Sequence, residues 1–444
     1  EAGGEADATT PADGEYVDYG APFATTEAPP ARQNYDAVIV GAGWAGIRAA
    51  ETLLSGGVEN VIILEAADHV GGRARSVNLD GSINDPSKVG DASNVPYDLG
   101  CEWLYDNGNA MEARLVERGY MDSALANDRY TAVPMQRGAF YRQTRDEDTG
   151  ELSAERIEDS DEWIEETWHK GFLQFREEQW DNLEGWSYAD AIDQYIEADR
   201  WTDDEYLQFF NLVEDVIETE YTADAGDLDL HEVEFFPRGY TVRSHYASLP
   251  GMGFGNIAAD YAESFRDKIR LGARVTEINS EGFNGGNGHD TVVRYVEDGE
   301  AREVNARTVL VTVSLGVLKA GSIDFVPSLP AWKQESIDEM GFGIVDKCIM
   351  SWDDDDSLVW PRDELWFLLT TPDDATSGRW TQFYNPSEFK GGRPSLTAWV
   401  GGDDAPEAEA QTDEAIVAHV MRNLRSMFPD ARDPDRTTVT RWGK

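Results

Sequence analysis

The feature that most constrains the fold is a short apolar run that ends in a glycine-rich turn. The run from Asp36 to Val40 is bounded by glycine, which is typical of a parallel strand buried on both faces. The residues after the turn predict a helix over 45–54 and a second strand over 61–64. A strand, a turn, a helix and a strand in this order predict an α/β fold with a doubly wound sheet. The glycines of the turn form the pattern GxGxxG, at Gly41, Gly43 and Gly46.

In this context the glycine pattern indicates a dinucleotide-binding site. Gly41 allows a tight turn, Gly43 lets a diphosphate approach the backbone, and Gly46 permits close packing of the helix on the strand. The N-terminus of the helix offers free N–H groups to the diphosphate. Glu65, at the end of the second strand, is expected to bind the ribose hydroxyls. A packing turn that binds nothing is the alternative interpretation.

A second glycine pair follows the acidic residue. Gly71 and Gly72 precede Arg73, an order that separates flavin-binding proteins from plain nicotinamide dehydrogenases. The glycines allow close backbone approach, and the guanidinium of Arg73 suits a diphosphate. The predicted cofactor is therefore FAD, and the alternative is a glycine turn followed by surface arginines.

The composition indicates a folded and strongly acidic protein. Hydrophobic residues make up 41% of the 444 residues, while 86 Asp and Glu against 37 Lys and Arg give a net charge of −49. Such a surface repels phosphate backbones, so nucleic-acid binding is not expected, and no apolar run is long enough to span a membrane. The charge favours either solubility in salt or attraction of a cationic ligand. The start at Glu1 instead of Met suggests a processed, soluble form that is secreted or imported into an organelle.

Histidine and cysteine usage adds little chemistry. The six histidines lack HxxH or HxxxH spacing, so no metal site is expected. Cys101 and Cys348 are too few for a disulfide framework, and the sequence leaves open whether they form a single bridge.

The chain divides into a tail and two discontinuous domains. Residues 1–33 are acidic and rich in Ala, Thr, Gly and Pro, a composition that cannot offset chain entropy by burial, so a disordered tail is predicted. Residues 34–115 and 245–330 are predicted to form the FAD-binding domain. Residues 116–244, expected to be helical, and residues 331–444 are predicted to form an α+β substrate-binding domain.

Outside the glycine motifs, short apolar runs predict further strands and a final helix. The strands are expected near residues 275–278, 291–296, 308–313, 344–352, 365–370, 379–384 and 395–400, and the helix over 413–427.

Three segments carry a resemblance to a known family, namely residues 309–319, 323–333 and 340–347. With the two glycine motifs, they make the chain similar to the flavin-dependent amine oxidases, in the branch of polyamine oxidases and flavin-type histone lysine demethylases. The resemblance implies that FAD oxidises a C–N bond of a primary or secondary amine, with a polyamine as the expected substrate. The products would be an imine, hydrolysed to an aldehyde, and H2O2 from reoxidation of the flavin by O2.

The resemblance also implies roles for single residues. Val275 would present its backbone to the adenine. Lys347 matches the lysine that holds a water near flavin N5 and assists reoxidation by O2. Apolar neighbours would desolvate such a lysine and favour its neutral form, whereas an exposed strand lysine is the alternative. Tyr384 falls where the family places an aromatic ring over the flavin or the substrate channel.

The segment from Asp98 to Asp106 departs from the family pattern. Tyr105 replaces the usual His or Glu, and Asp106 replaces a glycine. A substrate ammonium would then be held by Glu102 or Asp106 instead. Glu102, Tyr105 and Asp106, together with Tyr384, are the expected substrate side of the site.

The family's chain continues beyond a segment like Thr440–Gly443 into a glycine-rich stretch that closes the flavin site, whereas this sequence stops at Lys444. The expected explanation is either a fragment or one chain of a processed enzyme, and in the second case a companion chain would carry the remaining segment. The alternatives are a catalytically inactive structural or interaction protein with the same fold, and an L-amino-acid oxidase. The latter needs an arginine for the substrate carboxylate, and the sequence does not place one.

Overall fold

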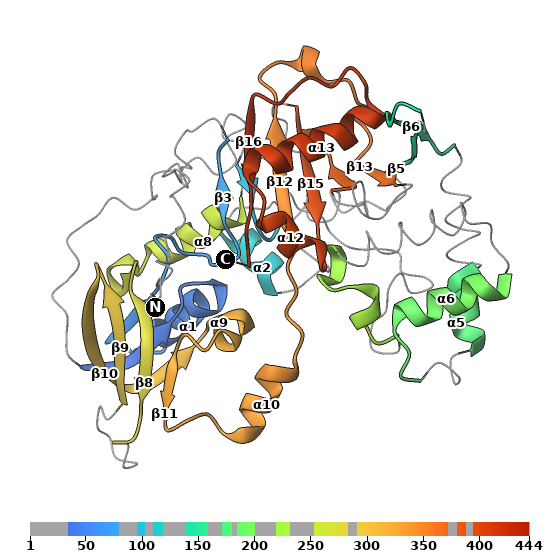
Figure 1. Cartoon of the computed structure of the whole chain (residues 1–444). Coiled ribbons are helices and arrows are strands. Elements are labelled where there is room, and N and C mark those ends of the chain that lie inside the picture. The colour runs from blue at the N-terminus through green and yellow to red at the C-terminus, as the bar shows by residue number, and fades with distance from the viewer. Residues whose placement is uncertain are drawn as a thin grey trace, which may run out of the picture.

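The structure is a computed structural model, and the tail predicted over residues 1–33 lies outside the residues that it describes. Those residues are 34–79, 96–102, 110–118, 138–146, 148–158, 171–179, 184–199, 219–230, 253–282, 291–371, 380–387 and 394–443. Within them, two seven-stranded sheets form the framework, and helices pack against both (Figure 1). The predicted α/β class is confirmed.

The first sheet has the strand order β11-β8-β9-β10-β1-β2-β7. Its strands are β1 (Asn34–Val40), β2 (Val61–Leu64), β7 (Ile269–Arg270), β8 (Arg274–Asn279), β9 (Thr291–Glu297), β10 (Glu300–Val311) and β11 (Asp324–Val326). Strand β1 lies between β10 and β2 and is parallel to both. Strands β8, β9 and β10 are connected as an antiparallel meander.

Strand β1 is buried on both faces because its apolar side chains alternate between two cores. Ala37 and Ile39 pack with α1 (Trp44–Ser55) and α8 (Phe254–Glu263). Val38 and Val40 pack with buried residues of β8, β9 and β10. In the described residues, helices thus cover one face and antiparallel strands cover the other. This two-sided burial explains the continuous apolar run in the sequence.

The second sheet has the strand order β16-β12-β15-β14-β13-β5-β6. Its strands are β5 (Gly138–Arg145), β6 (Leu152–Arg156), β12 (Asp346–Ser351), β13 (Trp366–Thr370), β14 (Gln382–Tyr384), β15 (Ser395–Val400) and β16 (Arg436–Val439). The last four predicted strand runs correspond to β12 to β15. Strands β5 and β6, in contrast, arise in a region that the sequence predicts to be helical. They join the sheet through β13, which pairs in parallel with β5 from far along the chain.

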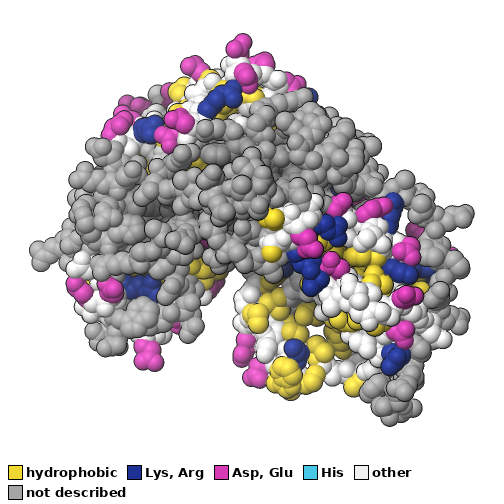
Figure 2. Space-filling model, turned by 180° about the vertical axis from the view of Figure 1, so that it is seen from behind, with side chains coloured by type: hydrophobic (Ala, Val, Ile, Leu, Met, Phe, Trp, Pro, Cys, Tyr) yellow, Lys and Arg dark blue, Asp and Glu magenta, His cyan; other side chains and the backbone are white. Residues whose placement is uncertain are grey.

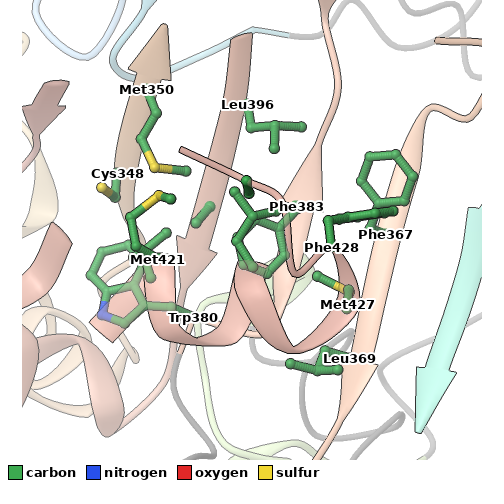
Figure 3. Packing of buried hydrophobic residues seen from close by; sticks show 14 of the residues in the cluster. Cys348, Met350, Phe367, Leu369, Trp380, Phe383, Leu396, Met421, Met427 and Phe428 are labelled. Atoms are coloured by element: carbon green, nitrogen blue, oxygen red, sulfur yellow. The ribbon is translucent and has the colours of Figure 1, made fainter. Parts of the chain in front are cut away.

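The second sheet packs against α13 (Asp413–Met427), whose bounds agree with the prediction. The helix begins at Thr412, whose hydroxyl accepts a hydrogen bond from the backbone N–H of Ala415, and two acidic residues follow in the first turn. Figure 3 shows Met421 of this helix beside Cys348 of β12 in the shared core. Both cysteines are free, so the possible bridge does not form in the structure.

The structure also describes six further α-helices. They are α2 (Ala110–Glu117), α5 (Leu173–Gln179), α6 (Tyr188–Asp199), α9 (Leu315–Lys319), α10 (Ala331–Glu339) and α12 (Asp404–Glu409). Among the described helices, none is long and apolar enough to cross a membrane. Figure 2 shows Asp and Glu side chains spread over the described part of one face, as expected from the composition.

Candidate active site

The GxGxxG turn connects β1 to α1 and is shaped by backbone contacts that exclude side chains. Gly41 has a φ of +101°, a conformation that favours glycine, and its N–H donates to the carbonyl of Leu64 at 2.9 Å. A Cβ on Gly46 would lie 1.9 Å from the Gly41 carbonyl oxygen. Gly43 caps α1 without a side-chain hydrogen bond, and the first turn holds no acidic residue. The start of the helix therefore offers its N–H groups to an anion.

The second glycine pair lies directly against this turn. The Gly71 N–H donates to the carbonyl of Ala42 at 2.8 Å, and Gly43 and Gly71 form an isolated parallel bridge. Gly71 and Gly72 both have positive φ, at +103° and +59°. Arg73 follows with an exposed side chain. The structure thus brings the two glycine motifs together into one backbone cradle.

Glu65 and Val275 mark one end of this cradle. The carboxylate of Glu65 accepts hydrogen bonds from the N–H groups of Ala42 at 2.6 Å and Ala67 at 2.8 Å. Its backbone carbonyl accepts from the N–H of Ala273 at 2.7 Å, two residues before Val275. The carboxylate is therefore fixed at the glycine turn, and the start of β8 is fixed beside it. This geometry suits a ribose at Glu65 with the adenine toward Val275.

The chain from Arg73 onward leads from the cradle to the segment around Gly100. The N–H of Leu99 donates to the carbonyl of Arg75 at 2.8 Å, and that of Cys101 donates to the carbonyl of Arg73 at 3.2 Å. A Cβ on Gly100 would lie 1.8 Å from the Arg73 carbonyl oxygen. The pairing of β3 (Ser76–Val77) with β4 (Tyr97–Asp98) extends this contact. The two segments therefore pack backbone against backbone.

The side chain of Asp98 anchors the same segment to the start of α8. Its Oδ1 atom accepts hydrogen bonds from the Ser76 hydroxyl at 2.6 Å and from the backbone N–H of Phe254 at 2.8 Å. The Ser76 hydroxyl in turn accepts from the N–H of Gly255 at 2.9 Å. An acidic side chain at a helix N-terminus is favourable because of the helix dipole. The segment is thereby held between the glycine cradle and α8.

Lys347 of β12 reaches this segment from the second sheet. It is 2% exposed, and its Nζ atom donates to the carbonyl oxygens of Asp98 at 3.0 Å and Gly100 at 2.8 Å. A third hydrogen bond, of 2.9 Å, goes to the carboxylate of Glu102. The expectation of apolar neighbours for Lys347 is therefore wrong. Glu102 is buried and paired with Lys347, and the expectation that it holds a substrate ammonium is corrected accordingly.

An aromatic row flanks Lys347 on the second sheet. Trp399 lies opposite Lys347 in the pairing of β12 with β15, and its ring centroid is 4.4 Å from Nζ. Trp366 packs between Trp399 and Tyr384, with ring centroids 6.1 and 5.2 Å away. Tyr384 is buried and lies at the far end of this row. The sequence did not single out Trp399, although the predicted strand over 395–400 includes it. Tyr105 and Asp106 lie outside the described residues.

A second buried acidic group lies next to Lys347. The Oδ1 atom of Asp346 accepts hydrogen bonds from the hydroxyl of Thr440 at 2.7 Å and from the backbone N–H of Trp442 at 3.1 Å. Burial, reinforced by the nearby Glu409 carboxylate, raises the pKa of Asp346 to about 7. The indole N–H of Trp442 donates to the carbonyl of Leu99 at 3.2 Å. Asp346 thus ties the end of the described chain to the segment that surrounds Lys347.

The fold and the site together define an α/β dinucleotide-binding protein with a second, mixed sheet that supplies a buried lysine. Residues 44–444 match the family model described as flavin containing amine oxidoreductase, and the chain belongs to that family. The family and branch inferred from the sequence are confirmed. The cofactor is FAD, as predicted.

Similar proteins include plant enzymes and solved oxidases. Polyamine oxidase 4 of Oryza sativa subsp. japonica is 28% identical over 420 residues, which cover 91% of this chain and 75% of the relative. Lysine-specific histone demethylase 1 homolog 1 of Arabidopsis thaliana is 28% identical, over 92% of this chain and 44% of the relative. A structure of putrescine oxidase bound to putrescine has a TM-score of 0.59 at 16% identity, covering 93% of this chain and 85% of that chain. This last likeness supports the fold alone.

Proposed function

We propose that the chain is an FAD-dependent amine oxidase that oxidises a C–N bond of a primary or secondary amine, with polyamines as the substrate class. The observation that carries this proposal is the continuous set of backbone contacts from the Gly41 turn, through Gly71 and Gly100, to Lys347. These contacts connect the proposed dinucleotide cradle to the buried lysine and so support the proposal. The relatives named polyamine oxidase support the substrate class.

The residues present fit FAD. The cradle of Gly41, Gly43 and Gly46 and the start of α1 would hold the diphosphate, together with Arg73. Glu65 would hold the ribose, and the backbone of Val275 would face the adenine. When bound, the flavin supplies the chemistry by taking a hydride equivalent from the carbon next to the nitrogen and passing two electrons to O2, which forms H2O2.

The protein's own residues would bind the amine and shield the reaction from water. Loss of the hydride from carbon and a proton from nitrogen leaves an imine, which water hydrolyses to an aldehyde and either ammonia, from a primary amine, or a shorter amine, from a secondary amine. The neutral form of the amine must reach the site, so water exclusion around the buried Lys347 and the aromatic row favours the reaction. Tyr384, Tyr105 and Asp106 remain our candidates for the substrate side.

The acidic character of the chain supports a cationic substrate. A net charge of −49 creates a negative field that raises the local concentration of polycations and their association rate. Because screening by salt weakens this field, the advantage of a polyamine over a monoamine should shrink as ionic strength rises.

The experiment that tests the proposal is oxygen consumption by the FAD-loaded protein with spermine, spermidine and an L-amino acid. Consumption of O2 with equal formation of H2O2 on the polyamines supports it. Turnover of the L-amino acid alone favours an amino-acid oxidase, and no turnover of any amine by a protein that retains FAD favours an inactive member of the family. Gly226→Ala serves as a control variant, because the added Cβ meets no atom within 4 Å. It should consume O2 at the rate of the unchanged protein.

A further inference from the structure

Among the described residues, the polar atoms that form hydrogen bonds with the Nζ atom of Lys347 are acceptors. Two are the carbonyl oxygens of Asp98 and Gly100, and the third is a carboxylate oxygen of Glu102, at 3.0, 2.8 and 2.9 Å. A neutral amine has two N–H donors, whereas an ammonium has three and no acceptor site. With Glu102 ionised, three acceptors at these distances fit the ammonium form. They also use all three of its N–H groups.

The burial of the pair makes the carboxylate essential to this arrangement. Both side chains are 3% exposed, and a buried charge that lacks a counter-ion is strongly disfavoured. Within the described residues, Glu102 is the carboxylate that forms an ion pair with Lys347. The face of the Trp399 ring, 4.4 Å from Nζ, stabilises the same cation.

We propose that Glu102 is a positioning residue that keeps Lys347 as an ammonium beside the flavin, so that Lys347 acts as a fixed positive charge. This assignment rests on the proposed function. As an ammonium, Lys347 has no lone pair to accept a proton, so it acts through its charge. Its charge stabilises the negative charge that develops on O2 as it takes up electrons.

Other ionisable groups around the pair leave this assignment intact. The carboxylate of Asp98 is bound by Ser76 and by the start of α8. Cys101 is exposed as a residue, but its thiol is surrounded by protein atoms, and this burial, with the charge of Asp98, raises its pKa to about 12. The thiol therefore stays neutral at ordinary pH. Arg73 adds positive charge on the cradle side.

The test uses sulfite, which adds to N5 of oxidised flavin and leaves a negative charge on the ring. The FAD-loaded protein is titrated with sulfite at about pH 6 and about pH 9, and loss of the flavin absorption gives the affinity. The sulfite affinity of Glu102→Gln is compared with that of the unchanged protein at the same pH. We expect the variant to bind sulfite at least as tightly at about pH 6 and at least ~10-fold more weakly at about pH 9. The reason is that the amine loses its proton more readily without its counter-ion.

Two further variants separate charge from structure. Lys347→Arg in the Glu102→Gln background should abolish the pH response, because a guanidinium stays charged. If Glu102→Gln does not fold, Glu102→Asp keeps the charge and should bind sulfite with the pH response of the unchanged protein. Glu297→Gln is the matched control, since Glu297 pairs with buried Arg270 at 3.0 Å in the first sheet, and it should leave the sulfite response unchanged.

The outcomes distinguish the two proposals. If Glu102→Gln follows the unchanged protein at both pH values, or if the pH response persists with Lys347→Arg, the assignment of Glu102 is wrong while the amine oxidase proposal stands. If the unchanged protein does not bind FAD, the proposed function fails, and the role of Glu102 fails with it.

Discussion

Asp346 makes the stability of the protein depend on pH, and Asp346→Asn tests this dependence. The carboxyl group is 1% exposed, and its Oδ1 atom accepts hydrogen bonds from Thr440 and Trp442. Burial disfavours the charged form, the Thr440 hydrogen bond opposes this effect, and the charge of Glu409 reinforces it. The result is a pKa raised from 3.8 to about 7.

The sign of the effect follows from the two pKa values. The folded chain keeps the proton of Asp346 up to about pH 7, whereas the unfolded chain loses it near pH 3.8. The stabilising contribution is therefore fully present below about pH 4 and is lost as pH rises through about 7. Since one pKa unit corresponds to ~1.4 kcal/mol, ionised Asp346 lowers the free energy of unfolding by up to ~4 kcal/mol relative to the protonated form.

Urea unfolding followed by tryptophan fluorescence measures this difference. The Asn side chain keeps the oxygen that accepts from Thr440 and Trp442 but carries no charge. We expect Asp346→Asn to be more stable than the unchanged protein by ~1–2 kcal/mol at about pH 5 and by ~3–4 kcal/mol at about pH 8. The exposed Asp338→Asn is the control and should change neither value. Equal stability of Asp346→Asn and the unchanged protein at both pH values would refute the reasoning.

Three further predictions concern the cradle, the ion pair and the last helix. Gly46→Ala places a Cβ 1.9 Å from the Gly41 carbonyl oxygen. We therefore expect the affinity for FAD, measured by absorbance titration, to fall at least ~10-fold. An unchanged affinity would argue against binding of FAD at this glycine turn. Lys347→Met leaves Glu102 buried without its cation and should lower the free energy of unfolding by ~3–5 kcal/mol. The double variant Lys347→Met with Glu102→Met should regain most of this loss. A double variant that is less stable than either single variant would contradict this prediction. Thr412→Ala removes the cap of α13 and should cost ~1 kcal/mol in urea unfolding, whereas an unchanged midpoint would show that the cap is dispensable.

The sequence predicted those strands and helices whose apolar pattern and flanking residues lie within or next to the element itself. The strand that ends at Val40, the strand over 61–64 and the helix over 413–427 have apolar periods and flanking residues that determine them without reference to the rest of the chain. The glycine motifs were also predictable from their own residues, because Gly41 and Gly71 adopt φ values above +100°, which favour glycine. These parts of the fold and the cradle were therefore accessible from sequence.

Contacts between distant segments were not accessible in the same way. Strand β5 pairs with β13, whose residues lie more than 200 positions later, and nothing within 138–145 identifies that partner. The pairing of Glu102 with Lys347 spans 245 positions, and its neighbours in sequence suggest a substrate contact instead. Trp399 acquires its place only because β15 lies antiparallel to β12. Each of these depends on strand register, which a single sequence does not reveal.

The most direct test of the amine oxidase assignment is the visible absorption spectrum of the FAD-loaded protein before and after anaerobic addition of spermine. We expect bands of oxidised flavin that bleach when spermine is added and return when O2 is admitted, because the amine reduces the flavin and O2 reoxidises it. Flavin bands that persist with spermine and with every other amine tested would contradict the assignment.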